Sequence, residues 1–350
     1  MQKKLIALAV AGMIAAPAFA QSNVTVYGRL DYGYLMTDTD TTTAGVKSST
    51  ETSSTGFCTS ALSTSRLGVM GSEDLGNGLK ANFQLELRIA DTSAFGSDTG
   101  ADLADSFDTR LALVGLSGGF GGVTLGRQYT AVETVWGIGS AGGLNNAAGA
   151  AYTSGVKFNN TRSDELITYT SPSMNGFKAQ VQYGKGTTET TTETSQKEFG
   201  LNVTYANGPL NVGLGYSKEK AEVANVTTSE PKQVLLGASY DFGAAKVFGL
   251  YANGSDDMAA GAADDLDRDV WELGVNVPVG MATTLIASYY RGDSEVGSTK
   301  SDIDGYQLGA VYSLSKRTKL YALYGNAESD TNSLNNSETT NFALGVRHDF

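Results

Sequence analysis

The chain has 350 residues, a formal charge of −12, 43 glycines, five prolines and a single cysteine. Its acidic balance makes it a poor candidate for binding nucleic acid or anionic membrane surfaces. Cys58 has no second cysteine to pair with, so burial and strand pairing must supply the stability of the fold.

Residues 1–20 have the three parts of a secretory signal peptide. Lys3 and Lys4 precede the apolar stretch 5–14, and a small-residue cleavage signal follows at 18–20. The apolar stretch is short for a hydrocarbon core of about 30 Å, which disfavours an uncleaved membrane anchor. Cleavage would leave 21–350 as one domain with 23 basic and 37 acidic side chains, a charge of −14. We therefore expect export through the periplasm.

Beyond this leader, apolar and polar side chains alternate along about sixteen segments, which is the period of a β-strand. Few prolines and 17 tyrosines favour long, regularly paired strands. No segment approaches the roughly 18 consecutive apolar residues of a transmembrane helix. The expected strands are 23–36, 63–73, 79–90, 109–117, 121–128, 164–171, 176–186, 196–206, 209–219, 231–242, 245–255, 267–277, 281–292, 303–314, 317–327 and 338–350.

The connections between these segments alternate between two kinds. Short ones rich in hairpin-turn residues lie at 73–78, 117–121, 171–176, 206–209, 241–243, 278–280 and 315–317. Long polar ones lie at 37–62, 91–107, 187–195, 220–230, 256–266, 293–302 and 328–337. Short turns on one rim and long loops on the other are typical of bacterial outer-membrane barrels.

The interruption at 129–163 differs from the other long connections, because it is weakly charged and rich in Gly, Ala and Asn. A long loop in a compact domain is usually functional. Low charge favours folding inward over standing in solvent. We predict that this third long loop folds into the lumen of the barrel.

Both ends of the mature chain are expected to be strands. A chain rarely stops within a strand unless a neighbour pairs with it, because unpaired buried backbone groups are costly. The segment 24–32 alternates like the C-terminal one, whose outer face would carry Phe342, Leu344, Val346, His348 and Phe350. Pairing of the two end strands would close the sheet. The predicted fold is all-β, a transmembrane antiparallel β-barrel of about 16 strands.

The alternation by itself fits two environments. A soluble sandwich would bury the apolar face of each strand, whereas a membrane barrel would turn that face to lipid and the polar face to water. Closure, strand number and the terminal Phe350 favour the membrane barrel.

Five segments resemble the Gram-negative general porin family in its beta-proteobacterial branch. They are strung along the mature chain in family order: 24–31 (VTVYGRLD), 65–81 (SRLGVMGSEDLGNGLKA), 123–128 (VTLGRQ), 169–177 (YTSPSMNGF) and 345–350 (GVRHDF). The resemblance implies a sixteen-stranded barrel in the outer membrane, in contact with lipid and lipopolysaccharide. It further implies a homotrimer and a third loop that narrows the lumen. Phe350 would belong to the assembly signal.

In this family the narrowing sets basic wall residues against acidic loop residues. The matching segments suggest Arg29, Arg66, Arg88 and Arg127 as wall charges, with Arg110 and Lys80 as weaker candidates. Strict alternation puts Arg127 on the outer face with Val123 and Leu125, unless Gly126 breaks the pleat or the strand has already ended. Each arginine could also simply pair with a lumen carboxylate such as Asp31 or Glu86 and hold the barrel shape.

The chain departs from the family at the loop and at one wall position. Glu133 is the only carboxylate of the loop before Asp164, and Met70 stands where the family often carries a basic residue. Several arginines facing one loop acid should give a positive local potential, which predicts a mild anion preference.

The expected function is passive, size-limited and weakly charge-selective passage of ions and small hydrophilic solutes. A solute-specific channel, an outer-membrane barrel enzyme and a soluble secreted adhesin are the alternatives. The only histidine, His348, is expected on the outward face near the periplasmic rim. It offers no Ser-His-Asp arrangement, so no catalytic residues are expected. We expect no metal ligands and no cofactor.

Overall fold

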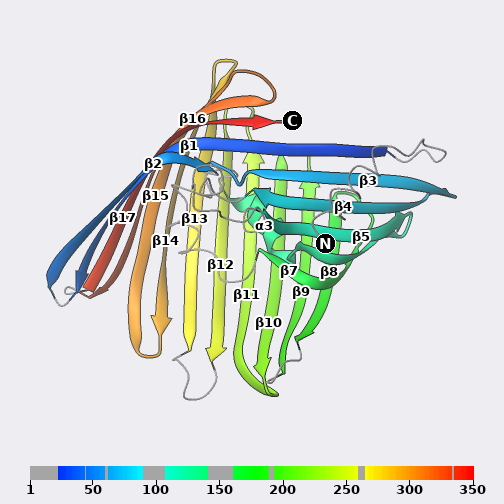
Figure 1. The fold of residues 1–350 in the computed structure, drawn as a ribbon, viewed down its shortest axis with the longest axis horizontal. Helices are drawn as coiled ribbons and strands as arrows, with labels where there is room; N and C mark the ends of the chain where they lie inside the picture. Colours follow the sequence, from blue (N-terminus) through cyan, green and yellow to red (C-terminus); the bar gives the residue numbers. More distant parts are fainter. Residues whose placement is uncertain are drawn as a thin grey trace, which may run out of the picture.

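The computed structural model describes residues 23–43, 45–59, 62–89, 107–140, 161–188, 193–258, 265–332 and 335–350. The strands form one antiparallel sheet that curls round, so that β17 returns to lie beside β1 (Figure 1). In chain order the elements are β1 (Asn23–Thr43), β2 (Val46–Thr59), β3 (Arg66–Gly76), β4 (Leu79–Ile89), β5 (Phe107–Gly118), β6 (Gly121–Tyr129), α3 (Ala131–Gly139), β7 (Arg162–Thr170), β8 (Phe177–Thr188), β9 (Thr194–Asn207), β10 (Leu210–Val223), β11 (Val226–Asp241), β12 (Lys246–Met258), β13 (Leu266–Val279), β14 (Thr283–Val296), β15 (Thr299–Ser313), β16 (Thr318–Asn332) and β17 (Asn335–Asp349).

The barrel has sixteen strand positions, because β2 and β3 share one of them. β2 pairs with the second half of β1, from Tyr32↔Thr59 onward, and β3 pairs with the first half, as far as Arg29↔Arg66. Every segment expected to be a strand has a strand as its counterpart. The prediction of a closed antiparallel barrel of about 16 strands is confirmed.

The two ends of the chain close the barrel, as expected from their alternation. β1 and β17 pair continuously from Arg29↔Asp349 to Thr42↔Asn336. One step further, Gly28 and Phe350 exchange two backbone hydrogen bonds of 3.1 Å each. The last backbone groups of the chain are therefore satisfied by its first strand.

The expectation that 220–230 is a long loop is wrong, because β10 and β11 continue through it. Only Ala224 and Asn225 connect the two strands, and both have positive φ, 50° and 63°. A two-residue turn with positive φ matches the right-handed twist of the strands that it joins. The polar composition of this segment thus belongs to a paired strand hairpin and not to a loop.

The same correction applies to three other predicted loops. Most of 37–62 is strand in β1 and β2, most of 293–302 in β14 and β15, and most of 328–337 in β16 and β17. Threonine is frequent in 37–62 and favours strands. Only the polarity of this segment suggested a loop. Of the remaining predicted loops, 91–106, 189–192 and 259–264 lie outside the described residues.

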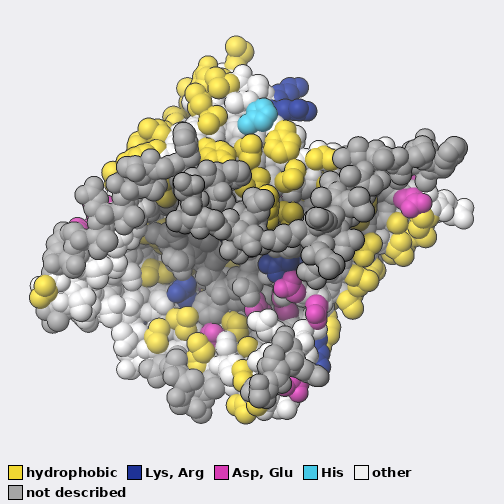
Figure 2. Space-filling view, viewed as in Figure 1, with side chains coloured by type: hydrophobic (Ala, Val, Ile, Leu, Met, Phe, Trp, Pro, Cys, Tyr) yellow, Lys and Arg dark blue, Asp and Glu magenta, His cyan; other side chains and the backbone are white. Residues whose placement is uncertain are grey.

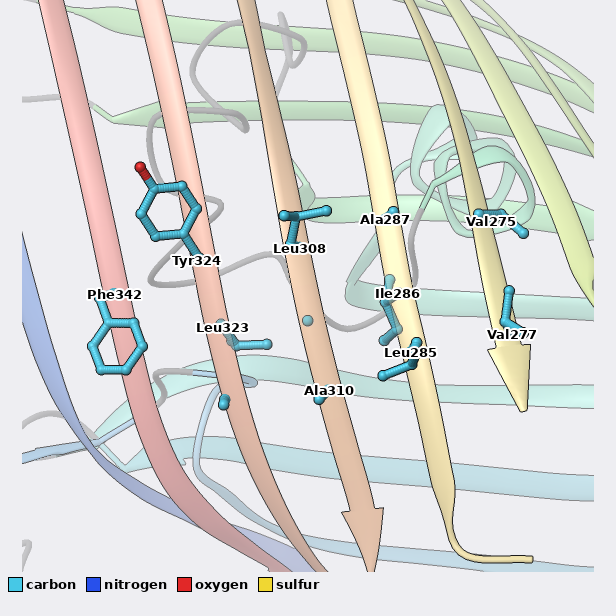
Figure 3. Close-up of a pocket in the computed structure, with 12 residues that line it drawn as sticks. Val275, Val277, Leu285, Ile286, Ala287, Leu308, Ala310, Leu323, Tyr324 and Phe342 are labelled. Carbon is cyan, nitrogen blue, oxygen red and sulfur yellow. The ribbon is translucent and has the colours of Figure 1, made fainter. Parts of the chain in front are cut away.

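The outer wall of the barrel is apolar. Leu85, Leu214 and Leu285 are exposed on it, whereas Gln182 and Gln307 are buried on the inner side. Figure 3 shows part of this wall, a shallow depression of about 420 Å³ whose apolar lining comes from β13 to β17. An apolar exterior around a closed sheet suits lipid, so the membrane-barrel interpretation of the alternation is the correct one.

Aromatic side chains pair near both ends of the strands. Phe177 and Tyr205 have ring centroids 4.5 Å apart beside one short turn, and Trp271 and Tyr289 lie 5.6 Å apart toward the opposite rim. Amphipathic rings at these two levels are typical of membrane–water interfaces. No helix among the described residues is both long and apolar enough to cross a membrane.

Candidate functional site

Five arginines form a group on the inner wall, which we call the arginine cluster. Its members come from β1, β3, β5, β7 and β17 and are Arg29, Arg66, Arg110, Arg162 and Arg347. Strand alternation places Arg29 opposite the exposed Leu30, and Arg66 opposite the exposed Leu67.

Glu86 is the centre of this cluster. Its buried carboxylate accepts from Arg110 Nε at 2.7 Å, lies 3.5 Å from an Arg66 guanidinium nitrogen, and accepts from the Tyr27 hydroxyl at 3.0 Å. Gln84 donates to the same hydroxyl at 2.7 Å. Charge-assisted bonds of this kind offset the desolvation of a buried carboxylate.

A β-bulge brings Arg110 inward. The register of β4 with β5 shifts between Glu86 and Leu87, so that Arg110 is the extra residue on β5. Both Arg110 and its neighbour Leu111 are consequently buried, which regular alternation would forbid.

A second carboxylate joins the cluster to the barrel closure. Asp349 on β17 accepts from Arg29 Nε at 2.6 Å and from an Arg347 nitrogen at 3.0 Å. Arg29 and Arg66 also share the Ser63 hydroxyl, at 2.6 and 3.2 Å. These contacts tie β17, β1 and β3 together at the level of the cluster.

The third carboxylate, Asp31, is fully buried and braces the neighbouring strands. It accepts from the Tyr321 hydroxyl on β16 at 2.7 Å and from the backbone N–H of Ser63 at 2.8 Å. Its own N–H donates to the Ser65 hydroxyl at 2.9 Å. Asp31 is therefore a structural carboxylate.

Arg162 extends the cluster toward the third loop. Its guanidinium carbon lies 5.5 Å from the centroid of the Tyr129 ring, a cation–π distance, and the Tyr129 hydroxyl accepts from Arg110 at 3.2 Å. Glu133 interacts with Arg162 electrostatically from α3. Within the described part of the chain, Arg162 has no carboxylate at ion-pair distance.

The predicted wall residues divide into two groups. Arg29, Arg66 and Arg110 belong to the arginine cluster, and Arg88 shares its face but pairs with Asp108. Lys80 lies at the opposite end of β4, beside the short turn to β3, and is not brought to the cluster.

Arg127 is also separate from the cluster. Gly126 has φ of 119°, and the register of β6 with β7 shifts between Gly126 and Gln128. The pleat is therefore broken at this glycine, one of the two options that strict alternation leaves. Arg127 binds Asp164 at 2.9 Å and the Thr109 carbonyl at 2.9 Å.

Sequence reasoning missed two members of the cluster. Arg347 could have been found, because Val346 and His348 alternate outward and leave it facing the lumen. Arg162 precedes the expected start of its strand at 164, so no alternation indicated its face. His348 is exposed and contacts the Thr318 hydroxyl at 2.9 Å, near the short turn between β15 and β16.

Helix α3, the start of the third loop, lies on the inner wall. Its buried side chains Val132, Val135 and Trp136 pack in one core with wall residues that include Leu235 and Leu250. A nine-residue helix is marginal in isolation, so this packing must stabilise it. The helix in turn shields the apolar side chains of the inner wall from the water of the lumen.

The wall beneath α3 is built from glycines, which we call the glycine seat: Gly200, Gly213, Gly215 and Gly237. A Cβ added at Gly237 would lie 2.6 Å from the Val135 carbonyl oxygen, and one added at Gly213 would lie 2.9 Å from Ile138. The absence of side chains lets the helix backbone approach the strands.

Wall amides fix the entry to α3. Gln182 donates to the Tyr129 carbonyl and Asn202 to the Ala131 carbonyl, each at 2.8 Å. The exposed helix residues are Thr134 and Gly137, and Glu133 is half-buried. Residues 129–140 thus lie inside the barrel, while 141–160 are outside the described residues, so inward folding of the whole loop stays a prediction.

Among the described residues, no group of three or more His, Cys, Asp or Glu side chains could hold a metal ion. Figure 2 shows basic and acidic side chains together in the hollow of the viewed face, with hydrophobic ones on its flanks. The arrangement can attract and orient ions.

Comparisons with known proteins give the site its context. The family described as Gram-negative porin matches residues 7–332. Outer membrane porin protein 32 of Delftia acidovorans is 37% identical over 338 residues, 93% of this chain and 88% of that protein. The major outer membrane protein P.IB of Neisseria meningitidis serogroup B is 27% identical over the full length of both chains. A solved structure, the anion-selective porin from Comamonas acidovorans, is 28% identical with a TM-score of 0.72, covering 94% of this chain and all of that one.

Proposed function

The chain belongs to the Gram-negative porin family and forms a diffusion channel in the outer membrane, and from this premise we propose that its arginine cluster makes the channel prefer anions. The observation that carries the proposal is the charge balance of the cluster. Five guanidinium groups lie with three carboxylates, Asp31, Glu86 and Asp349.

On the opposite side of the lumen the helix adds little negative charge, and the inward carboxylates of the wall there are Glu198, Glu219 and Glu272. α3 covers β9 to β12 and carries one carboxylate, Glu133. Charges in a narrow aperture with low-dielectric walls act far more strongly than exposed charges. At physiological salt the screening length is about 8 Å, so distant acids at the rims contribute little. The net charge of −14 expected for the mature chain therefore does not decide the selectivity.

Transport through this constriction is passive, and no catalytic step is proposed. Solute size is limited by the gap between α3 and the arginine cluster, and the field across the gap orients dipolar solutes. The anion-selective porin from Comamonas acidovorans, similar over nearly its whole length, supports the proposed preference.

The remaining expectations complete the proposal. The signal peptide 1–20 is removed, loop 129–163 as a whole narrows the lumen, and Phe350 acts in assembly. The channel is a homotrimer in contact with outer-membrane lipid and lipopolysaccharide, and ions and small hydrophilic solutes pass through it. A related fold, an outer membrane protein of Vibrio cholerae, has been solved in a trimer form.

The test is the reversal potential of the purified protein in a planar bilayer between two KCl concentrations. We expect the sign of an anion-selective channel, and a shift toward zero in the variants Arg66→Gln and Arg162→Gln, singly and combined. Arg317→Gln, in the short turn before β16, is the matched control and should leave the potential unchanged. A cation-selective wild type would overturn the preference but keep the channel, and absence of conductance would overturn both.

A further inference from the structure

Five lysines gather on the outer wall, near the loop rim of β8 to β11. This lysine patch consists of Lys185, Lys197, Lys218, Lys220 and Lys232. They alternate in step with exposed outward residues of the same strands, such as Tyr183, Phe199 and Leu214. The patch therefore faces away from the lumen and takes no part in the proposed selectivity.

Strand register sets these lysines directly opposite one another. Lys185 pairs with Lys197, Lys197 pairs with Lys220, and Lys218 pairs with Lys232. Side chains in such positions have Cβ atoms about 4.5–5.5 Å apart, and like charges there are destabilising. The fold thus concentrates positive charge at this place at a cost in stability.

Within the described ranges, carboxylates compensate this charge only in part. Glu222 forms ion pairs with two lysines of the patch, with nitrogen–oxygen distances of 2.8 and 2.9 Å. Glu230 and Asp257 each form one ion pair with the patch, at 2.5 and 3.2 Å. In the described ranges Lys185 has no ion pair. Counted over the described residues, five ammonium groups and these three paired carboxylates leave an excess of two positive charges.

An aromatic and apolar wall continues from the patch toward the middle of the barrel. Tyr183 pairs across the strands with Phe199, whose ring centroid lies 6.4 Å from that of Tyr216. Val181, Leu201 and other exposed apolar residues follow. A cationic row above an aromatic band and an apolar surface matches the order of phosphate, interface and acyl chains in a lipid.

The other side of the same rim has the opposite charge. Asp269 pairs with Asp293, Asp293 with Asp302, and Asp302 with Asp330, across β13 to β16. These side chains share the outward face with Trp271 and Tyr289. That sector would repel phosphate, so the attraction is confined to β8–β11.

The geometry points to the lysine patch as a binding site for the phosphate groups of an anionic outer-leaflet lipid, with the lipid's acyl chains on the apolar wall below. The inference rests on the proposed contact with outer-membrane lipid and names the part of the barrel that makes it. The acidic net charge of the chain does not exclude this binding, because binding to an anionic surface depends on the local charge within the screening length.

The test is binding of bisphosphorylated lipid A to the detergent-solubilised protein, measured by native mass spectrometry and titration calorimetry. The variant K185Q/K197Q/K220Q removes the longer lysine row, and K246Q/K316Q/K319Q removes the same charge near the opposite rim. We expect at least tenfold weaker binding by the first variant and wild-type binding by the second. Unchanged single-channel conductance of both variants would show that the barrels are intact.

Three results would overturn the inference. One is binding by K185Q/K197Q/K220Q within twofold of the wild type. Another is equal binding of lipid A from which the phosphates have been removed. The third is displacement of lipid A by inorganic phosphate at equal concentration, which would indicate a site for free phosphate. None of these depends on the reversal potential, so the lipid site and the anion preference can fail separately.

Discussion

Gly237 of β11 lies directly beneath the backbone of Val135 in α3, so close that a Cβ at position 237 would be 2.6 Å from the Val135 carbonyl oxygen. This contact joins the wall of the barrel to the helix inside it. Together with the rest of the glycine seat, it sets how far α3 stands from the strands. We therefore expect the width of the passage to depend on residues that have no side chain.

Substitution of Gly237 by alanine should lift α3 from the wall and lower the single-channel conductance. Overpacking of this kind typically costs about 1–3 kcal/mol of stability. Gly122→Ala is the control, because a Cβ there would meet nothing closer than 3.5 Å. Equal conductance of the two variants would show that the seat does not set the passage.

Replacement of Glu86 by glutamine should raise the anion preference and lower the stability together. The change removes the carboxylate that holds both Arg66 and Arg110, and loss of one partner from a buried pair costs about 3–5 kcal/mol. Reversal potential and thermal unfolding measure the two effects. Glu73→Gln, an exposed position on β3, should alter neither. A fall in anion preference in the Glu86 variant would contradict the assignment.

The hydroxyl of Tyr321 should matter for stability and not for transport. It donates to the buried carboxylate of Asp31 across the closure of the barrel, and hydrogen bonds to charged groups contribute about 1.5–3 kcal/mol. Tyr321→Phe should therefore unfold at a lower temperature with an unchanged reversal potential. Tyr312→Phe, where the side chain is exposed on the outer wall, should unfold like the wild type.

The anion preference should weaken as salt concentration rises. The screening length falls from about 30 Å at 0.01 M to about 3 Å at 1 M, so the arginine cluster acts over less of the passage at high salt. Reversal potentials at a fixed concentration ratio but different absolute concentrations measure this directly. A preference independent of salt would point to direct ion binding in place of a local potential.

The alternation of apolar and polar residues in the sequence was sufficient to predict the barrel. Period-two segments predicted all sixteen strand positions, and the alternating ends predicted the pairing of β1 with β17. Strand lengths were underestimated, because polar residues also occur in the paired strand ends that were expected to be loops. The faces of Arg29 and Arg66 followed from the same alternation, since both lie in regular parts of their strands.

Only the tertiary structure decided which other arginines join the arginine cluster. The bulge opposite Glu86 turns Arg110 inward, and the break at Gly126 directs Arg127 to Asp164. Alternation reports a side chain's face only while the pleat is regular, and bulges depend on the register with a neighbouring strand. The docking of α3 on the glycine seat likewise depends on contacts between segments far apart in the chain, which no local pattern of residues contains.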